Sequence, residues 1–196
     1  MHRPTAVPGA LRIGGASAFW GDSSVGPAQL VAHGDVDFVV FDYLAETTMA
    51  ILAGQRRRDA SAGYATDFVE LAMRPLLGEI ASKGIRVVAN AGGLNPEGCA
   101  AALRRHIDAA GLALRVAVVT GDDVLARLPE WQASGVLAAS ALAVPPTALL
   151  SANAYLGAYP IAAALDAGAD IVVTGRCVDS AVTLGPLIHA HRWAPD

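Results

Sequence analysis

Five short runs of apolar residues constrain the fold of this chain more than any other feature. The runs are nearly continuous rather than alternating with polar residues, and they comprise residues 11–13, 37–41, 85–89, 115–119 and 170–174. Continuous apolar strands are buried on both faces, which is typical of parallel sheets. Segments with helical spacing separate several of the runs, at residues 68–80, 100–110 and 161–167. This order predicts an α/β fold with a predominantly parallel sheet and helices on both faces, a Rossmann-like layered architecture.

The length and composition predict one domain with a sizeable core. The 196 residues are 54% apolar and only 16% charged, which excludes a disordered chain. We therefore expect a single α/β domain over residues 1–196. Because few residues are charged, part of the surface is apolar and is suited to burial against another subunit. We therefore expect a homo-oligomer or a partner subunit. The segment 191–196 ends directly after a predicted helix with no strand to follow. This predicts a domain truncated at its C-terminus, the amino-terminal part of a longer family domain.

Charge and targeting features exclude several classes of protein. The net charge is −4, and the 14 Lys and Arg residues are scattered except at Arg56–Arg58, so we expect no nucleic-acid partner. We assign that triplet to a helix C-terminus, where cations oppose the helix dipole. No apolar run approaches the length of a membrane helix, and the first residues do not form a signal peptide. The two cysteines, Cys99 and Cys177, form no CxxC motif. We expect a bacterial-type cytoplasmic protein without a membrane partner.

Polar and glycine-rich clusters flank the predicted strands. They comprise residues 14–23, 42–46, 90–96, 120–123, 151–157 and 174–180. Ligands of open parallel sheets bind outside the carboxyl ends of the strands. We therefore expect these clusters to converge on a small organic ligand.

The candidate catalytic residues are the acids of these clusters, which are suited to proton transfer. They are Asp42, Glu46 and Asp122. The candidate substrate-binding residues offer backbone N–H groups, amides, hydroxyls or charges. They are Gly14, Gly15, Ser17, Asp22, Asn90, Gly92, Gly93, Asn95, Asn153, Arg176 and Asp179. Arg176 is the one cation of the clusters and can bind a carboxylate or phosphate with its planar fork.

Each cluster also has a purely structural interpretation, which the sequence leaves open. The glycines can serve tight turns, and Asn95 followed by Pro96 is an ordinary helix start. Helix capping can likewise account for the acids at 122–123 and for residues 179–180. Arg176 can form an internal ion pair with Asp179 or Asp42.

The sequence identifies no cofactor. Neither GxGxxG nor GxxxxGK[ST] spacing occurs, so a nucleotide cofactor is unsupported, although coenzyme A remains allowed as part of the substrate. No histidine lies in a strand-end cluster and no HExxH motif is present, so we predict no metal site. Three converging carboxylates would nevertheless suit a magnesium-type ion.

Five segments of the chain resemble the amino-terminal domain of the acyclic terpene utilisation family, AtuA-like proteins. The segments are residues 13–22, 41–46, 90–96, 151–158 and 168–176. The resemblance runs in order over nearly the whole chain. It implies a role in degrading branched isoprenoid-like acids as coenzyme A thioesters, and it carries no catalytic residues with it.

Two functions remain open at this point. The first is an enzyme of hydratase, lyase or isomerase type acting on an acyl-CoA or a related acid. The second is a non-catalytic ligand-binding or scaffold subunit of a larger catabolic complex.

Overall fold

A parallel sheet of five strands forms the centre of the computed structural model, which describes residues 10–138, 142 and 144–194. The strands are β1 (Ile13–Ser17), β2 (Phe38–Phe41), β3 (Arg86–Ala89), β4 (Val116–Val119) and β5 (Ile171–Thr174). Their order is β1-β2-β3-β5-β4, and every neighbouring pair is parallel. The predicted parallel α/β architecture is confirmed.

Alternate residues of the central strands enter two separate cores. On β2, Val39 and Phe41 face one core, whereas Phe38 and Val40 face the other, and all four are buried. Each side of the strand therefore needs apolar residues, which explains the continuous apolar runs.

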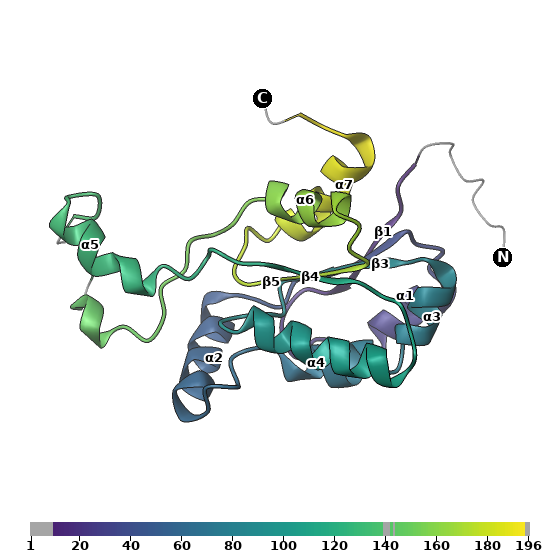
Figure 1. Cartoon of the computed structure of the whole chain (residues 1–196), viewed down its shortest axis with the longest axis horizontal. Helices are drawn as coiled ribbons and strands as arrows, with labels where there is room; N and C mark the ends of the chain where they lie inside the picture. Colours follow the sequence, from purple (N-terminus) through teal and green to yellow (C-terminus); the bar gives the residue numbers. More distant parts are fainter. Residues whose placement is uncertain (1–9, 139–141, 143, 195–196) are drawn as a thin grey trace.

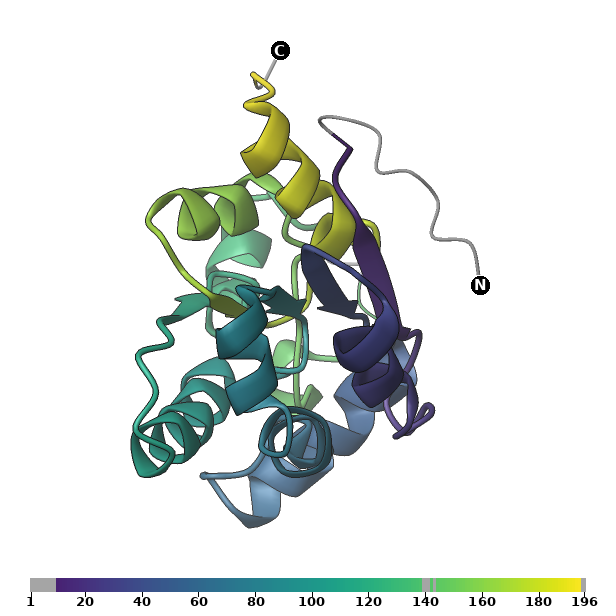
Figure 2. The same cartoon turned by 90° about the vertical axis from the view of Figure 1, so that its right-hand side faces the viewer.

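Helices cover both faces of the sheet, as predicted. One face carries α1 (Gly26–His33), the π-helix η1 (Phe68–Met73), α3 (Leu77–Lys83) and α4 (Pro96–Ala109). The other face carries α6 (Tyr159–Asp166) and α7 (Ala181–His191), which also pack against each other. Figures 1 and 2 show the two layers on opposite sides of the strands.

The first strand and the first predicted helix differ from expectation. β1 begins at Ile13 and includes Gly14 and Gly15, which we predicted to follow the strand. Gly14 packs tightly under α1, where an added Cβ would lie 2.9 Å from the Cδ2 atom of Leu30. The predicted helix 68–80 is divided into η1 and α3. Pro75 lies between the two and has no N–H for the helical ladder.

A projecting segment separates β4 from α6, and we call its described residues, 124–138, 142 and 144–151, the arm. The arm carries η2 (Leu125–Arg127), α5 (Leu128–Ala133) and η4 (Pro146–Ala148), and it extends away from the sheet in Figure 1. Two backbone hydrogen bonds close its base: Val124 N–H donates to Ala152 O (2.9 Å), and Ala154 N–H donates to Asp122 O (2.7 Å). Within the described part of the chain, no helix is both long and apolar enough to cross a membrane.

Candidate functional site

Asp42 is oriented by a buried asparagine at the carboxyl edge of the sheet. Asn90 follows β3, is fully buried, and donates from Nδ2 to Asp42 Oδ1 at 2.5 Å. Its Oδ1 accepts from the backbone N–H groups of Tyr43 (2.5 Å) and Leu44 (3.2 Å). Asn90 therefore fixes both the Asp42 carboxylate and the backbone that follows β2.

The environment of Asp42 favours its protonated form. Burial raises the pKa of Asp42, and the negative charge of Asp179 acts in the same direction, whereas the Asn90 hydrogen bond and the Arg176 charge oppose the shift. A carboxyl group with a raised pKa is suited to proton transfer near neutral pH.

This raised pKa predicts a specific pH dependence of stability. A carboxyl that binds its proton more tightly in the folded state favours folding at low pH. That contribution is lost as the pH rises from the unfolded value, about 3.9, through the raised folded pKa. We therefore expect the free energy of unfolding of the wild type to fall relative to that of Asp42→Asn over this window. Urea unfolding of both proteins at a series of pH values measures the difference. A difference that is constant, or that changes in the opposite direction, contradicts the prediction.

Arg176 is buried and has internal partners. Its Nη1 donates to Asp179 Oδ1 (2.8 Å) and to the carbonyl of Cys177 (3.0 Å). Its guanidinium lies 4.1 Å from the centre of the Tyr155 ring, and Tyr155 donates its hydroxyl hydrogen to Glu46. Only 3% of Arg176 is exposed, so the structure realises the internal ion pair with Asp179 that the sequence left open.

Asp122 is buried beside the backbone of Arg176. Its Oδ2 accepts from Arg176 N–H (2.8 Å) and from Asn153 Nδ2 (2.8 Å). Burial raises the pKa of Asp122, and these hydrogen bonds oppose the shift. A Cβ on Gly175 would overlap the Asp122 carboxylate, so the glycine permits this close approach.

A cavity of about 310 Å³ opens beside Asp122 at the carboxyl edge of the sheet. The turn between β3 and α4 and the loop after β4 supply most of its wall. The lining residues are Arg56, Gly93, Leu94, Asn95, Pro96, Glu97, Thr120, Gly121, Asp122 and Asp123. This volume lies at the lower end of the range for small-molecule sites.

The model of the family described as "Acyclic terpene utilisation family protein AtuA" matches residues 11–196. The chain belongs to this family. No curated protein and no solved structure gives a significant match to the chain. Membership of the AtuA family points to acyclic terpene utilisation as the biological setting.

Apart from Gly92, the predicted site residues of this AtuA-family chain fall into three groups. The first is a set of ionic and hydrogen-bonded contacts, in which Asn90 binds Asp42 and Arg176 pairs with Asp179 and Glu46. The second lines the cavity and comprises Gly93, Asn95 and Asp122. Asp122 joins the two groups through the Arg176 N–H and also holds Asn153.

The third group lies at the β1 edge, apart from the cavity. It comprises Gly14, Gly15, Ser17 and Asp22. Asp22 closes a local turn by accepting from the N–H groups of Ala18 (2.9 Å) and Ser23 (2.7 Å). The Ser17 hydroxyl is buried and has no hydrogen-bond partner among the described residues.

The capping interpretations have mixed outcomes. Asn95 caps α4, because its Oδ1 accepts from Gly98 N–H at 3.0 Å. Asp123 accepts similarly from Leu125 N–H at 3.1 Å. At α7 the capping prediction is wrong: Ser180 makes no side-chain capping bond, and Asp179 binds Arg176 instead. Gly92 serves packing, since it lies against Pro96 and the carbonyl of Thr174.

Sequence reasoning did not place Tyr155 or Arg56 in the site. Tyr155 covers Arg176, and Arg56 lines the cavity and donates to the carbonyl of Leu94. The only sequence signal for Arg56 was its place in an arginine triplet. Within the described residues, no three His, Cys, Asp or Glu side chains are grouped so that they could hold a metal ion.

Proposed function

We propose that this AtuA-family protein is a cytoplasmic enzyme of acyclic terpene or branched carboxylic acid catabolism. Its reaction is of the hydratase, lyase or isomerase type, and its substrate is an acyl-CoA thioester or a related acid. Coenzyme A enters as part of the substrate, and no separate cofactor is required by the proposal. The observation that carries it is a buried carboxyl of raised pKa, Asp122, in the wall of a cavity at the carboxyl edge of the sheet.

The chemistry follows from the acidity of carbon next to a thioester carbonyl. These three reaction types all involve moving a proton to or from the acyl chain, and a carboxyl whose pKa is raised is a better general acid or base than a free carboxyl. We assign this role to Asp122, with Asn153 and the Arg176 N–H holding its carboxylate in place. Asp42 is the second candidate, because Asn90 orients it and burial raises its pKa. Glu46 has the least support of the three acids, because its side chain is exposed and bonded to Tyr155.

A second function is favoured by the same network. Arg176 is neutralised by Asp179, and Asp122 already accepts two hydrogen bonds, as in a purely structural arrangement. Exposed apolar side chains, including Val136 at 74% and Leu150 at 53%, also offer surface to another subunit or to a second copy. These features support a non-catalytic ligand-binding or scaffold subunit of a catabolic complex.

Turnover of defined substrates separates the two functions. The protein is incubated with a panel of branched acyl-CoA thioesters and free acids, and the products are followed by mass spectrometry. We expect turnover that falls by about 100-fold or more in Asp122→Asn, the range for a lost general acid or base, while substrate binding remains.

Asp166→Asn is the matched control for this experiment. Asp166 ends α6 at the opposite edge of the sheet, where it hydrogen-bonds His189 at 2.5 Å. This variant should retain wild-type turnover. Binding of a thioester without turnover by the wild type supports the scaffold function instead. Equal rates for the wild type and Asp122→Asn would remove Asp122 from the mechanism.

A further inference from the structure

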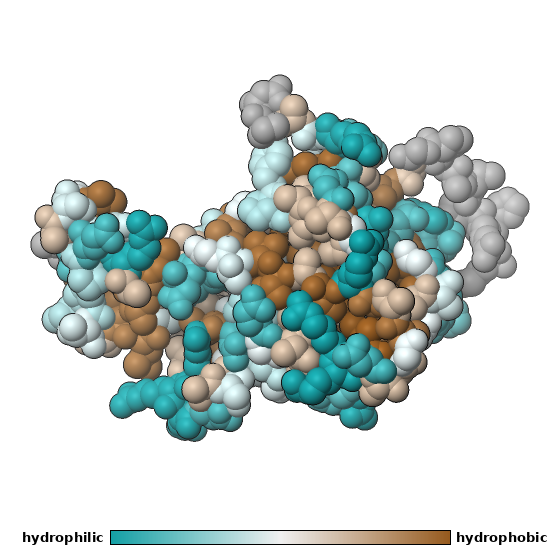
Figure 3. Space-filling view, viewed as in Figure 1, coloured by the Kyte–Doolittle hydropathy of each residue, from teal (hydrophilic) through white to brown (hydrophobic). Residues whose placement is uncertain are grey.

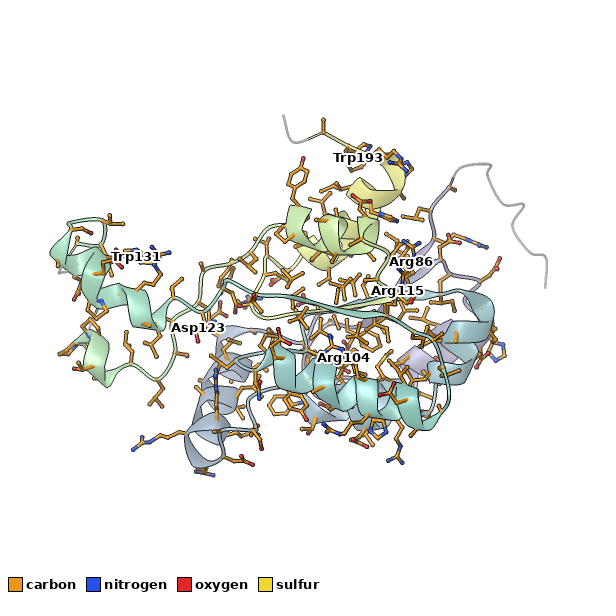
Figure 4. All side chains as sticks on the ribbon, in the orientation of Figure 1. Arg86, Arg104, Arg115, Asp123, Trp131 and Trp193 are labelled. Carbon is orange, nitrogen blue, oxygen red and sulfur yellow. The ribbon has the colours of Figure 1, made fainter. Side chains whose placement is uncertain are left out.

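A second hollow continues from the cavity beside Asp122 and lies between α2 (Glu46–Arg58) and the base of the arm. Its volume is about 390 Å³, and we call it the arm groove. Its lining residues are Ala53, Arg56, Arg57, Leu94, Asp123, Leu125, Leu149 and Leu150. Arg56, Leu94 and Asp123 also line the first cavity, so the two hollows are contiguous. Figure 4 places Asp123 where the arm joins the sheet, above α2 in this view.

The wall of the arm groove is mostly aliphatic. Leu94 comes from the turn before α4, Leu125 from η2, and Leu149 and Leu150 from the returning segment of the arm. Leu150 is 53% exposed, although it is a large apolar side chain. In Figure 3 the hydrophobic underside of the arm faces the hydrophilic end of α2 across this hollow. Such a surface favours an aliphatic chain over a polar one.

The two arginines of the arm groove have no ion-pair partner among the residues that the structure describes. Ion pairs within 4.0 Å hold Arg12, Arg74, Arg115 and Arg176, but among the described residues none involves Arg56 or Arg57. Arg56 Nη1 donates to the carbonyl of Leu94, and this bond fixes the guanidinium group without supplying a negative charge. The single acid of the groove, Asp123, uses Oδ1 to accept from the N–H of Leu125.

We infer that the arm groove is a binding subsite for an amphipathic anion, with its aliphatic chain on the leucines and its carboxylate or phosphate group on Arg57 and Arg56. A guanidinium binds either anion through paired N–H donors, so the two head groups share one recognition chemistry. The continuity of the groove with the Asp122 cavity makes one extended site for chain and reacting group. That this anion is also the enzyme's substrate rests on the proposed function. Binding of the anion in the arm groove does not.

Isothermal titration calorimetry on the whole protein tests the subsite with four probes. Decanoate carries a chain and a carboxylate, decanol has the chain alone, coenzyme A has phosphates without a chain, and decanoyl-CoA has both chain and phosphates. The variants are Arg57→Gln, Leu150→Ser and the matched control Arg58→Gln. Arg58 is the next residue of the same triplet and does not line the groove.

We expect Arg57→Gln to raise the Kd of the anionic amphiphiles by about tenfold, as for one lost charge-assisted hydrogen bond. Arg58→Gln should leave the same Kd within about twofold of wild type, because Arg58 is exposed and does not line the groove, so salt screens its charge. Decanol binding should respond to Leu150→Ser and not to Arg57→Gln. If the groove binds carboxylates, Arg57→Gln weakens the binding of decanoate but not that of coenzyme A. If it binds phosphates, Arg57→Gln weakens the binding of both coenzyme A and decanoyl-CoA.

Three results would overturn the subsite: equal effects of Arg57→Gln and Arg58→Gln, no effect of either, or no binding of any probe to the wild type. Thermal melts confirm that each variant is folded, and the exposed positions of Arg57 and Leu150 make unfolding unexpected. Failure of the proposed function has a different signature. In that case Arg57-dependent binding persists while no thioester is turned over by the wild type.

Discussion

Gly92→Ala is expected to lower the free energy of unfolding by about 3 kcal/mol, the upper range for overpacking a dense interior. A Cβ at this position would lie 2.6 Å from the carbonyl oxygen of Thr174 and 2.6 Å from the Cβ of Pro96. Neither neighbour can rotate away, because one is backbone at the end of β5 and the other is a proline ring at the start of α4. The Gly92 N–H also donates to the same Thr174 carbonyl at 3.0 Å. Chemical denaturation with matched m-values measures the loss.

Gly15→Ala is the matched control for this glycine. Both residues were predicted to bind substrate, but a Cβ on Gly15 would have no heavy atom within 4 Å. We expect its free energy of unfolding to stay within about 0.5 kcal/mol of wild type. Equal stability of Gly92→Ala and Gly15→Ala would show that the packing of Gly92 against Pro96 and Thr174 is looser than the structure indicates.

Arg176→Lys is expected to lower the free energy of unfolding by about 2 kcal/mol. Lysine keeps the charge, but its side chain is shorter and has no planar guanidinium to lie against the Tyr155 ring, so its ammonium does not take the place from which Nη1 donates to Asp179 and to the Cys177 carbonyl. The Cys177 carbonyl would lose a charged donor in a buried place, which accounts for most of the expected loss. Thermal and urea unfolding of the two proteins measure the change.

Ligand binding by the same variant separates a structural arginine from an anion anchor. If Arg176 is structural, the affinity for decanoyl-CoA stays within about twofold of wild type after correction for unfolded protein. Asp179→Asn is the companion variant, because it removes the carboxylate partner of the buried Arg176 and leaves the guanidinium itself in place. If Arg176 is structural, this variant should also keep its affinity for decanoyl-CoA within about twofold of wild type after the same correction. Weakened binding by Arg176→Lys with an unchanged melting temperature contradicts the structural role and supports Arg176 as the residue that binds the anionic group of the ligand.

The local sequence was sufficient for elements whose signals are short in range. Residues 37–41 predicted a strand buried on both faces, and β2 has this burial because helices cover both faces of the sheet there. Asn95 and Pro96 predicted the start of α4, and both act within one helical turn. Arg56–Arg58 likewise ends α2, as the helix dipole favours.

The sequence was insufficient where a residue's environment comes from distant parts of the chain. Gly14 and Gly15 read as turn residues because glycine has a low strand propensity, yet β1 continues through them, and Leu30 of α1 fills the space above Gly14. The sequence position of Asp179 favoured a capping role at the start of α7, but in the structure the Asp179 carboxylate binds Arg176 instead.

The sequence by itself determined the parallel sheet, its two helical layers and the edge at which polar loops gather. Hydrophobic periodicity and the glycines and prolines that end helices and strands are local signals, which depend only on residues close together in the chain. Only the tertiary structure decided how that edge is divided. Strand order places the end of β5 between β3 and β4, so Asp122 meets Arg176 and Asn153 rather than Asp42. The direction of the arm brings Leu149 and Leu150 opposite Arg57, nearly a hundred positions away along the chain. Such contacts depend on the packing of whole elements against one another, and no local pattern of residues encodes them.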